Sequence, residues 1–281
     1  MLVPLRAGRS SSAQTGRRTI AWATDLGEMT QSAVERASAL ERAIVGLRRS
    51  GGLEAAAAEA LRAISGPIER YPAARAVSPV AGEPRTKWML SGWACEMRVL
   101  PDGRRQIYSF ALPGDVVLSR PVNVSGPCSL VALTPIECVD VAHLLSRARK
   151  PDRDEISKAM NRALHEMQER RYEAIVRLGR RSAVQRVADL LLELHDRLSD
   201  VGLVSDDGFR LPLTQEHFAD ALGLSVVHVN RSLRTLRLNK LVNFRFGRAS
   251  GFDRAGLITF SQSSLESLPR TAFAGGDPAA A

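Results

Sequence analysis

The chain is poor in cysteine and has no long hydrophobic run. Its 281 residues include Cys95, Cys128 and Cys138, an odd number without metal-ligand spacing, so the sequence describes neither a disulfide scaffold nor a zinc ribbon. We expect reduced cysteines in or near a core. No apolar stretch approaches the roughly 20 residues of a membrane-spanning helix, and Met1–Thr19 lacks the apolar stretch of a signal peptide. The sequence therefore predicts a soluble, cytoplasmic protein without a membrane partner.

Acidic residues and recognisable catalytic spacings are also scarce. Thirty Asp and Glu against 39 Lys and Arg leave a net charge of +9, which favours a polyanionic partner, either nucleic acid or an anionic membrane. The five histidines are scattered, and no Ser–His–Asp, paired-carboxylate or HExxH spacing emerges. No glycine-rich phosphate loop follows a strand. We predict that the chain is not an enzyme and uses no cofactor or metal; an enzyme with an attached DNA-binding domain is the alternative.

Changes in the spacing of apolar residues along the chain predict an α+β fold. A Ser-, Gly- and Arg-rich stretch at residues 1–19, which we expect to be disordered, precedes helical patterns at 30–49 and 53–64. Short apolar pieces follow, and a long helical pattern begins near Asp152. The predicted segments are 1–70 (tail and helices of unclear role), 71–150 (β-roll), 151–181 (dimerisation helix), 182–265 (winged helix-turn-helix) and 266–281 (disordered tail).

Turn signals between the short apolar pieces favour a small antiparallel barrel or roll. Gly, Pro and Asp interrupt the apolar pieces at a regular pitch, as at Pro101–Gly103 and Pro113–Asp115. The Pro-Asp-Gly turn suits a hairpin, because Gly supplies a positive φ. Strands are expected at 88–90, 94–100, 106–112 and 116–118.

The long helix carries a narrow apolar seam. Such a seam is typical of a coiled coil, and its simplest partner is a second copy of the chain. The alternatives are that the seam packs against the chain's own barrel or that it docks another protein. Another amphipathic helix is expected from Ser182 to about Leu198. The seam alternates four and three residues, with a break where Arg170 would fall: Ile156, Met160, Ala163, Met167 and Ala174.

Residues 214–236 have the pattern of a helix-turn-helix. Thr214 is a candidate N-cap, Gly223 allows the positive φ that ends the first helix, and Ser225 caps the second. An ordinary helical hairpin is the alternative, but it does not explain the basic surface of the second helix. Two apolar sets are expected to face inward: Phe218, Ala219 and Leu222 on the first helix, and Val229 with Leu233 or Leu236 on the second.

The second helix and the residues after it form a basic strip. Between Ser225 and Ser250 there are six Lys or Arg and no Asp or Glu, which suits a phosphate backbone. In a major groove Arg231 could pair with guanine and Asn230 with adenine, although Arg231 could equally bind a phosphate. The predicted DNA-contacting residues are Thr214, Ser225, Val226, Val227, His228, Asn230, Arg231, Arg234, Arg245 and Arg248.

A wing is expected beside the second helix. Short strands are predicted at 242–246 and 257–260, and residues 209–213 offer a third strand. A small sheet next to a recognition helix makes a winged helix. Arg245 and Arg248 would then hold adjacent phosphates.

Together these motifs resemble the Crp/Fnr family of bacterial transcription regulators. The resemblance is carried by Leu213–Leu233 and, upstream, by Leu90–Ala94, Leu100–Ile107 and Phe110–Asp115, and it covers about residues 71–260. It implies a cyclic-nucleotide-binding-like β-roll, a dimerising helix and a winged helix-turn-helix. It further implies a homodimer on a two-fold-symmetric site in double-stranded DNA, with RNA polymerase as another partner.

The sequence departs from this family at its sensing and recognition residues. Family members that bind cyclic nucleotides carry a Gly-Glu stretch followed by Arg-Ser or Arg-Thr, whereas residues 115–132 contain no such cassette and Arg120 alone is a poor substitute. Iron–sulfur sensing in Fnr-type members uses clustered N-terminal cysteines, and no cysteine precedes Cys95. Val226-Val227 stands where cyclic-AMP-receptor-like members have Arg-Glu, so the preferred DNA sequence should differ. The effector is not identified.

Two further interpretations stay open. A constitutive regulator would use its roll only as a scaffold. A sequence-independent architectural protein would bind DNA with an affinity set almost wholly by salt.

Overall fold

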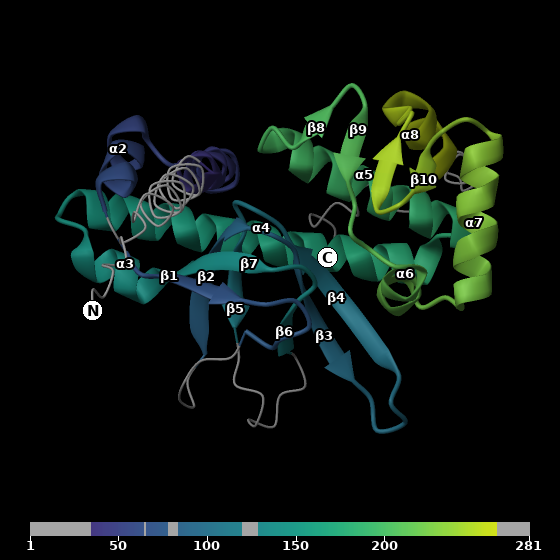
Figure 1. The fold of residues 1–281 in the computed structure, drawn as a ribbon, viewed down its shortest axis with the longest axis horizontal. Helices are drawn as coiled ribbons and strands as arrows, with labels where there is room; N and C mark the ends of the chain where they lie inside the picture. The colour runs from purple at the N-terminus through teal and green to yellow at the C-terminus, as the bar shows by residue number, and fades with distance from the viewer. Residues whose placement is uncertain (1–34, 65, 78–83, 120–128, 263–281) are drawn as a thin grey trace, which may run out of the picture. The chain divides into compact units, whose positions relative to one another are not determined.

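The computed structural model describes residues 35–64, 66–77, 84–119 and 129–262 (Figure 1). The chain forms two units, Met1–Glu41 and Arg42–Ala281. Residues 35–41 of the first unit are helical, and so are residues 42–51 of the second. The predictions for the two tails, for Arg120 and for Cys128 lie outside the described residues, and the predicted domain boundaries stay predictions.

The middle of the chain folds into two antiparallel sheets, which confirms the predicted α+β class with a roll. One sheet has the strand order β1-β7-β2-β5 and the other β4-β3-β6. The sequence predicted four of these strands but not β1, β6 and β7, which are only four or five residues long. The strands are β1 (Ile68–Tyr71), β2 (Arg85–Ser91), β3 (Ala94–Val99), β4 (Arg105–Ala111), β5 (Val116–Ser119), β6 (Ser129–Ala132) and β7 (Ile136–Asp140).

Two turns of the roll have the predicted chemistry. At the β3–β4 hairpin, the Leu100 N–H donates to the Arg104 carbonyl at 2.7 Å, and Gly103 has a φ of 83°. Between β4 and β5, the Leu112 N–H donates to the Asp115 carboxylate at 2.6 Å, and Gly114 has a φ of 93°. Glycine adopts these left-handed conformations without the steric cost of a Cβ atom.

Helices dominate the rest of the chain, and a small four-stranded sheet accompanies them. The predicted long helix is α4 (Asp152–Arg180), which continues through Gly179, and the predicted amphipathic helix is α5 (Ala183–Asp200). The small sheet has the order β10-β11-β9-β8. The other elements are α2 (Ala55–Ala63), α3 (Val141–Arg147), β8 (Val204–Ser205), β9 (Gly208–Arg210), α6 (Gln215–Leu222), α7 (Val226–Leu238), β10 (Asn243–Arg245), β11 (Arg248–Ser250) and α8 (Arg254–Gln262).

The strand predicted at residues 257–260 is wrong, because this segment belongs to α8. Asp253 begins the helix: its carboxylate accepts from the Gly256 N–H at 2.9 Å, and its carbonyl accepts from the Leu257 N–H. Leu257 and Ser261 are buried four residues apart, which is helical spacing. A short apolar run does not distinguish a strand from a buried helix by itself.

The apolar seam of α4 faces the chain itself, as in the alternative interpretation. Ile156, Met160, Ala163 and Met167 are each at most 3% exposed, and Met167 belongs to the roll core. These four side chains are therefore covered without a second copy, and their assignment to a dimer surface is corrected; Ala174 is partly exposed.

The break in the seam at Arg170 has a structural reason. The four-and-three spacing continues through Arg170 and Ala174 to Arg177, which is buried. Arg170 Nη1 lies 3.9 Å from Asp115 Oδ1, so the arginine also points toward the roll. The same face of α4 is thus apolar in its first half and ionic in its second.

A buried arginine joins the roll to α5. Arg197 donates to the Phe110 carbonyl at 2.7 Å, to the Asp115 carboxylate, and to Glu193 Oε1 at 2.9 Å. Burial lowers the pKa of this guanidinium, but the two carboxylates outweigh burial and hold its pKa above the ordinary value. Arg197 therefore stays charged inside the protein.

Arg177 extends this arrangement to α4. It donates to Glu193 Oε2 at 2.7 Å. Burial raises the pKa of Glu193, but Arg197 and Arg177 outweigh it and the net pKa lies below the ordinary value. The resulting ionic cluster connects the β4–β5 turn, α4 and α5; its members are Asp115, Arg170, Arg177, Glu193 and Arg197.

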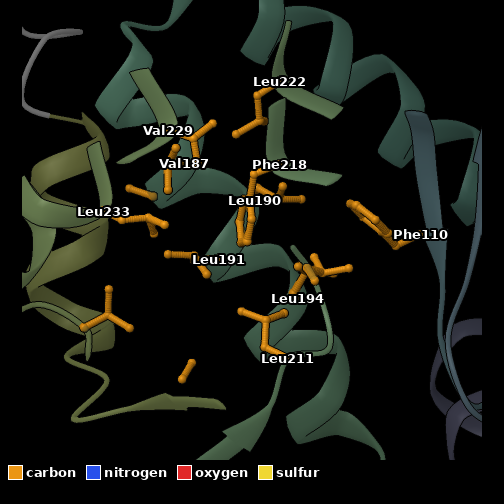
Figure 2. Close-up of a cluster of buried hydrophobic side chains, with 14 of the residues drawn as sticks. Phe110, Val187, Leu190, Leu191, Leu194, Leu211, Phe218, Leu222, Val229 and Leu233 are labelled. Atoms are coloured by element: carbon orange, nitrogen blue, oxygen red, sulfur yellow. The ribbon is translucent and has the colours of Figure 1, made fainter. Parts of the chain in front are cut away.

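One apolar core continues from the roll into the C-terminal helices. Figure 2 shows Phe110 of β4 facing the leucines of α5 and Phe218 of α6, and all belong to one cluster of buried side chains. Leu190, Leu191 and Leu194 are at most 2% exposed. Because this core is shared, the C-terminal region packs on the roll rather than hanging from a linker.

Candidate nucleic-acid interface

The N-terminus of α6 is closed by a reciprocal cap. The Thr214 hydroxyl accepts from the His217 N–H at 3.2 Å, and His217 Nδ1 accepts from the Thr214 N–H at 3.1 Å. The sequence predicted Thr214 as the cap but not the histidine that answers it. The pair satisfies two of the amide groups that a helix start leaves without partners.

Protonation of His217 would remove one half of this cap, because a protonated ring nitrogen cannot accept. Burial lowers the pKa of His217, Arg105 lowers it further, and Asp220 and Glu216 raise it without reversing the shift. The folded chain therefore binds this proton more weakly than the unfolded chain does. The contribution of neutral His217 to the free energy of unfolding is fully present above the ordinary histidine pKa of about 6.5, and it falls as the pH drops below that value.

We therefore expect His217→Gln to make the stability less dependent on pH. Glutamine at this position can accept from the same N–H without titrating between pH 5 and 7. Urea denaturation of both proteins across this range measures the effect, and the wild type should lose more stability toward pH 5. Parallel pH profiles would contradict this role for His217.

The turn between α6 and α7 follows the predicted design. Gly223 ends α6 with a φ of 60°, and the Leu224 N–H donates to the Ala219 carbonyl at 3.1 Å. Ser225 then caps α7, because its hydroxyl accepts from the His228 N–H at 3.3 Å. The predicted inward residues are all buried: Phe218, Ala219, Leu222, Val229, Leu233 and Leu236.

Every residue predicted to contact DNA has an exposed side chain. This holds for Thr214, for Ser225 and for the predicted residues of α7 and the wing, although exposure alone does not test the contacts. Val227 is 59% exposed in the first turn of α7, where an apolar side chain gains nothing from folding. His228 has a second partner, since its Nδ1 lies 2.9 Å from the Ser225 hydroxyl. The outward face of α7 thus offers apolar, amide and guanidinium groups together.

The wing is a two-residue hairpin between β10 and β11. Arg245 and Arg248 pair across its end, and both are exposed. Phe244 holds the hairpin against the helices, because its ring makes an edge contact with Phe218 at a centroid distance of 6.0 Å. Like charges opposite each other in a ladder are destabilising by themselves, so this pair favours an anionic partner.

Two surface features were not singled out in the sequence. Phe246 at the tip of the wing is completely exposed. Tyr172, Ile175 and Val176 form an exposed apolar patch on α4, since residues three and four apart share a helix face. The helical spacing of these three residues could have predicted the patch from the sequence, but the patch lies on a different face of α4 from the seam.

The described cysteines are not placed as exposed sensors. Cys95 and Cys138 are both buried, and burial raises the pKa of the Cys138 thiol to about 12. A protonated thiol is a poor nucleophile and a poor metal ligand. Within the described ranges, no group of three or more His, Cys, Asp or Glu side chains is arranged to hold a metal ion. Of the helices in these ranges, none has both the length and the apolar character needed to span a bilayer.

The C-terminal region matches a known domain family. A family model described as a Crp-like helix-turn-helix domain covers residues 185–260, which include α5, the helix-turn-helix and the wing. The structure of FixK2 from Bradyrhizobium japonicum matches 70% of this chain and 97% of its own length, with a TM-score of 0.55 and 25% sequence identity.

Two relatives extend the similarity beyond this domain. FixK of Bradyrhizobium diazoefficiens, a nitrogen fixation regulation protein, is 33% identical over 165 residues, which are 56% of this chain and 66% of the relative. AadR of Rhodopseudomonas palustris, a transcriptional activatory protein, is 31% identical over 161 residues, which are 55% of this chain and 64% of the relative. The aligned part therefore spans just under two thirds of these relatives.

A cyclic-nucleotide-binding-like roll, a long helix and a C-terminal winged helix-turn-helix define a class of DNA-binding regulators. The chain belongs to the Crp/Fnr family within that class. Its relatives are transcription regulators and not enzymes.

Proposed function

We propose that the chain regulates transcription by binding, as a homodimer, to a two-fold-symmetric site in double-stranded DNA. The observation that carries this proposal is the outward face of α7. Its first turns expose Val226, Val227, Asn230 and Arg231 next to the Ser225 cap. A helix of this kind reads base edges in the major groove with its N-terminal residues.

Charge around α7 supports DNA as the partner. Asp253 is the first acid after Asp220, and it is engaged at the start of α8. The six basic residues between these acids therefore have no neighbouring carboxylate along the chain. Such a surface neutralises phosphates and gains free energy from released counterions.

The apolar patch on α4 supports a homodimer. Tyr172, Ile175 and Val176 are 52%, 64% and 49% exposed, although they are surrounded by a largely charged helix. Exposed apolar patches of this kind mark interaction sites. A helix that pairs with the same helix of a second copy buries each residue against a symmetric equivalent. The symmetry of the dimer would then set the symmetry of the DNA site.

A groove beside the patch supports the same arrangement. It has a volume of about 540 Å³, and its lining includes Tyr108 of β4 together with Tyr172 and Ile175. Glu96 and Arg171 form an ion pair at its polar end. We propose that side chains of the second copy cover this groove.

Two sensing mechanisms of the family depend on residues that this sequence does not have. We propose that the chain uses neither a cyclic nucleotide nor an iron–sulfur cluster, because the phosphate cassette and the N-terminal cysteines are missing from its sequence. RNA polymerase is proposed as the partner through which bound protein acts on transcription.

Arg231→Ala tests the proposed base contact. We expect affinity for the preferred site to fall by about 1–3 kcal/mol, and the preference at one base position to be lost, because a bidentate arginine–guanine contact is removed. Arg254→Ala removes the same charge from α8 and serves as the control. Binding selections on each protein measure both effects. An equal loss at all sequences would instead assign Arg231 to a phosphate.

A further inference from the structure

The tip of the wing carries an aromatic side chain in an unfavourable place. Phe246 and Gly247 are the two turn residues of the β10–β11 hairpin, with φ values of 49° and 69°. Positive φ at both positions is the combination of a type I′ turn, for which Asn-Gly is preferred. A bulky residue at the first position is strained, and the Phe246 ring is completely exposed, so packing does not offset the strain.

The apolar residues at the base of the wing are packed, unlike Phe246. Phe244, two residues earlier, packs on Phe218, and its cross-strand partner Ala249 is fully buried. These residues anchor the hairpin and leave its tip projecting. A strained, projecting side chain on a rigid support is a reason to look for a function at that position.

The surroundings of Phe246 identify the kind of partner. Arg245 and Arg248 flank the Phe246–Gly247 turn as a cross-strand pair, and both are exposed. The Leu211 N–H donates to the Gly247 carbonyl at 2.7 Å and so holds the turn in place. Leu211 lies three residues before Thr214 in the sequence. Thr214 begins the helix-turn-helix, so the wing tip is fixed near the start of the element that binds DNA.

We propose that Phe246 is an apolar wedge that enters the minor groove beside each half-site, while Arg245 and Arg248 bind the phosphates on either side. Apolar side chains that enter this groove partly unstack a base step and bend the duplex. Pyrimidine–purine steps unstack most easily. The wing therefore selects flexible steps outside the bases that α7 reads. This inference rests on the proposed DNA-binding function and adds a second determinant of sequence preference.

The test uses the full-length protein and a duplex that carries its selected site, with 2-aminopurine in the flanking step. Wild-type protein should raise the fluorescence of this base on binding and bend the duplex. Phe246→Asn should abolish both responses and weaken binding about tenfold, with an unchanged salt dependence. Phe246→Leu should retain the responses, because leucine also acts as a wedge.

Two controls separate the outcomes. Phe246→Asn should melt at the same temperature as wild type or higher, because asparagine adopts the positive φ more readily. Arg248→Ala should lower the salt slope by about one unit and retain the fluorescence response. If Phe246→Asn binds and bends the duplex as the wild type does, the wedge is overturned but the proposed function is not. The exposed ring would then be assigned to contact with a protein partner. A wild-type protein without a preferred sequence would overturn the proposed function as well.

Discussion

Arg197→Met is expected to lower the free energy of unfolding by about 3–5 kcal/mol, because it removes one partner from a buried set of charges. Arg197 is 9% exposed and contacts Asp115, Glu193 and the Phe110 carbonyl. Methionine fills much of the same volume, so the loss reports charge rather than a cavity. Without the guanidinium, the Asp115 carboxylate stays largely buried with Arg170 as its remaining, more distant cation.

The matched control for Arg197→Met is Arg254→Met. Arg254 makes two good hydrogen bonds to Asp196, both at 2.8 Å, but the pair is about half exposed. An exposed ion pair contributes little to stability because solvent screens it, so this variant should unfold almost as the wild type does. Urea midpoints at an unchanged m value measure both effects. Equal midpoints for the two variants would contradict the structural role of the ionic cluster.

Ile175→Glu is expected to weaken self-association by on the order of 100-fold or more, because like charges would meet across the symmetric interface. Ile175 is 64% exposed at the centre of the α4 patch, between Tyr172 and Val176. Glutamate is a good helix former, and an exposed position tolerates it, so the fold should be retained. DNA binding should weaken in parallel, since a monomer holds only one half-site.

Val45→Glu is the control for this substitution. Val45 is likewise an exposed β-branched residue in a helical segment, but it lies outside α4. Sedimentation velocity at micromolar concentration should show wild type and Val45→Glu as dimers and Ile175→Glu as a monomer. A dimeric Ile175→Glu protein would place the dimer surface elsewhere.

The helix-turn-helix could be predicted from the sequence because its signals are local. Thr214, Gly223 and Ser225 each satisfy or release backbone groups of the adjacent helix, and the structure uses all three. The apolar spacing likewise identified the buried face of each helix. A local pattern of this kind needs no knowledge of the rest of the fold.

The α4 seam shows what spacing alone does not determine. Periodicity groups Ile156, Met160 and Met167 on one face, but it does not say what covers that face. The roll and α2 pack on α4, and Asp115, one of the two charged partners of Arg170, lies far away in the sequence. Long-range pairing also explains the missed strands, because β1 and β7 are stabilised by each other.

The exposed features escaped prediction for a different reason. Phe246 reads as one more apolar residue in a short strand, and only the turn geometry shows that its ring projects. The positive charges of Arg245 and Arg248 indicate from the sequence that the wing binds an anion, whereas a single aromatic residue gives no such indication.

The most direct test of sequence-specific binding by a dimer is selection of bound DNA from a random pool by the purified full-length protein. Binding by a symmetric dimer predicts an inverted repeat whose half-sites lie about one helical turn apart, roughly 10–11 base pairs between centres. It also predicts a binding constant that exceeds nonspecific binding by at least about 10³-fold at physiological salt. Recovery of unrelated sequences, with an affinity set only by salt, would contradict it and favour an architectural protein.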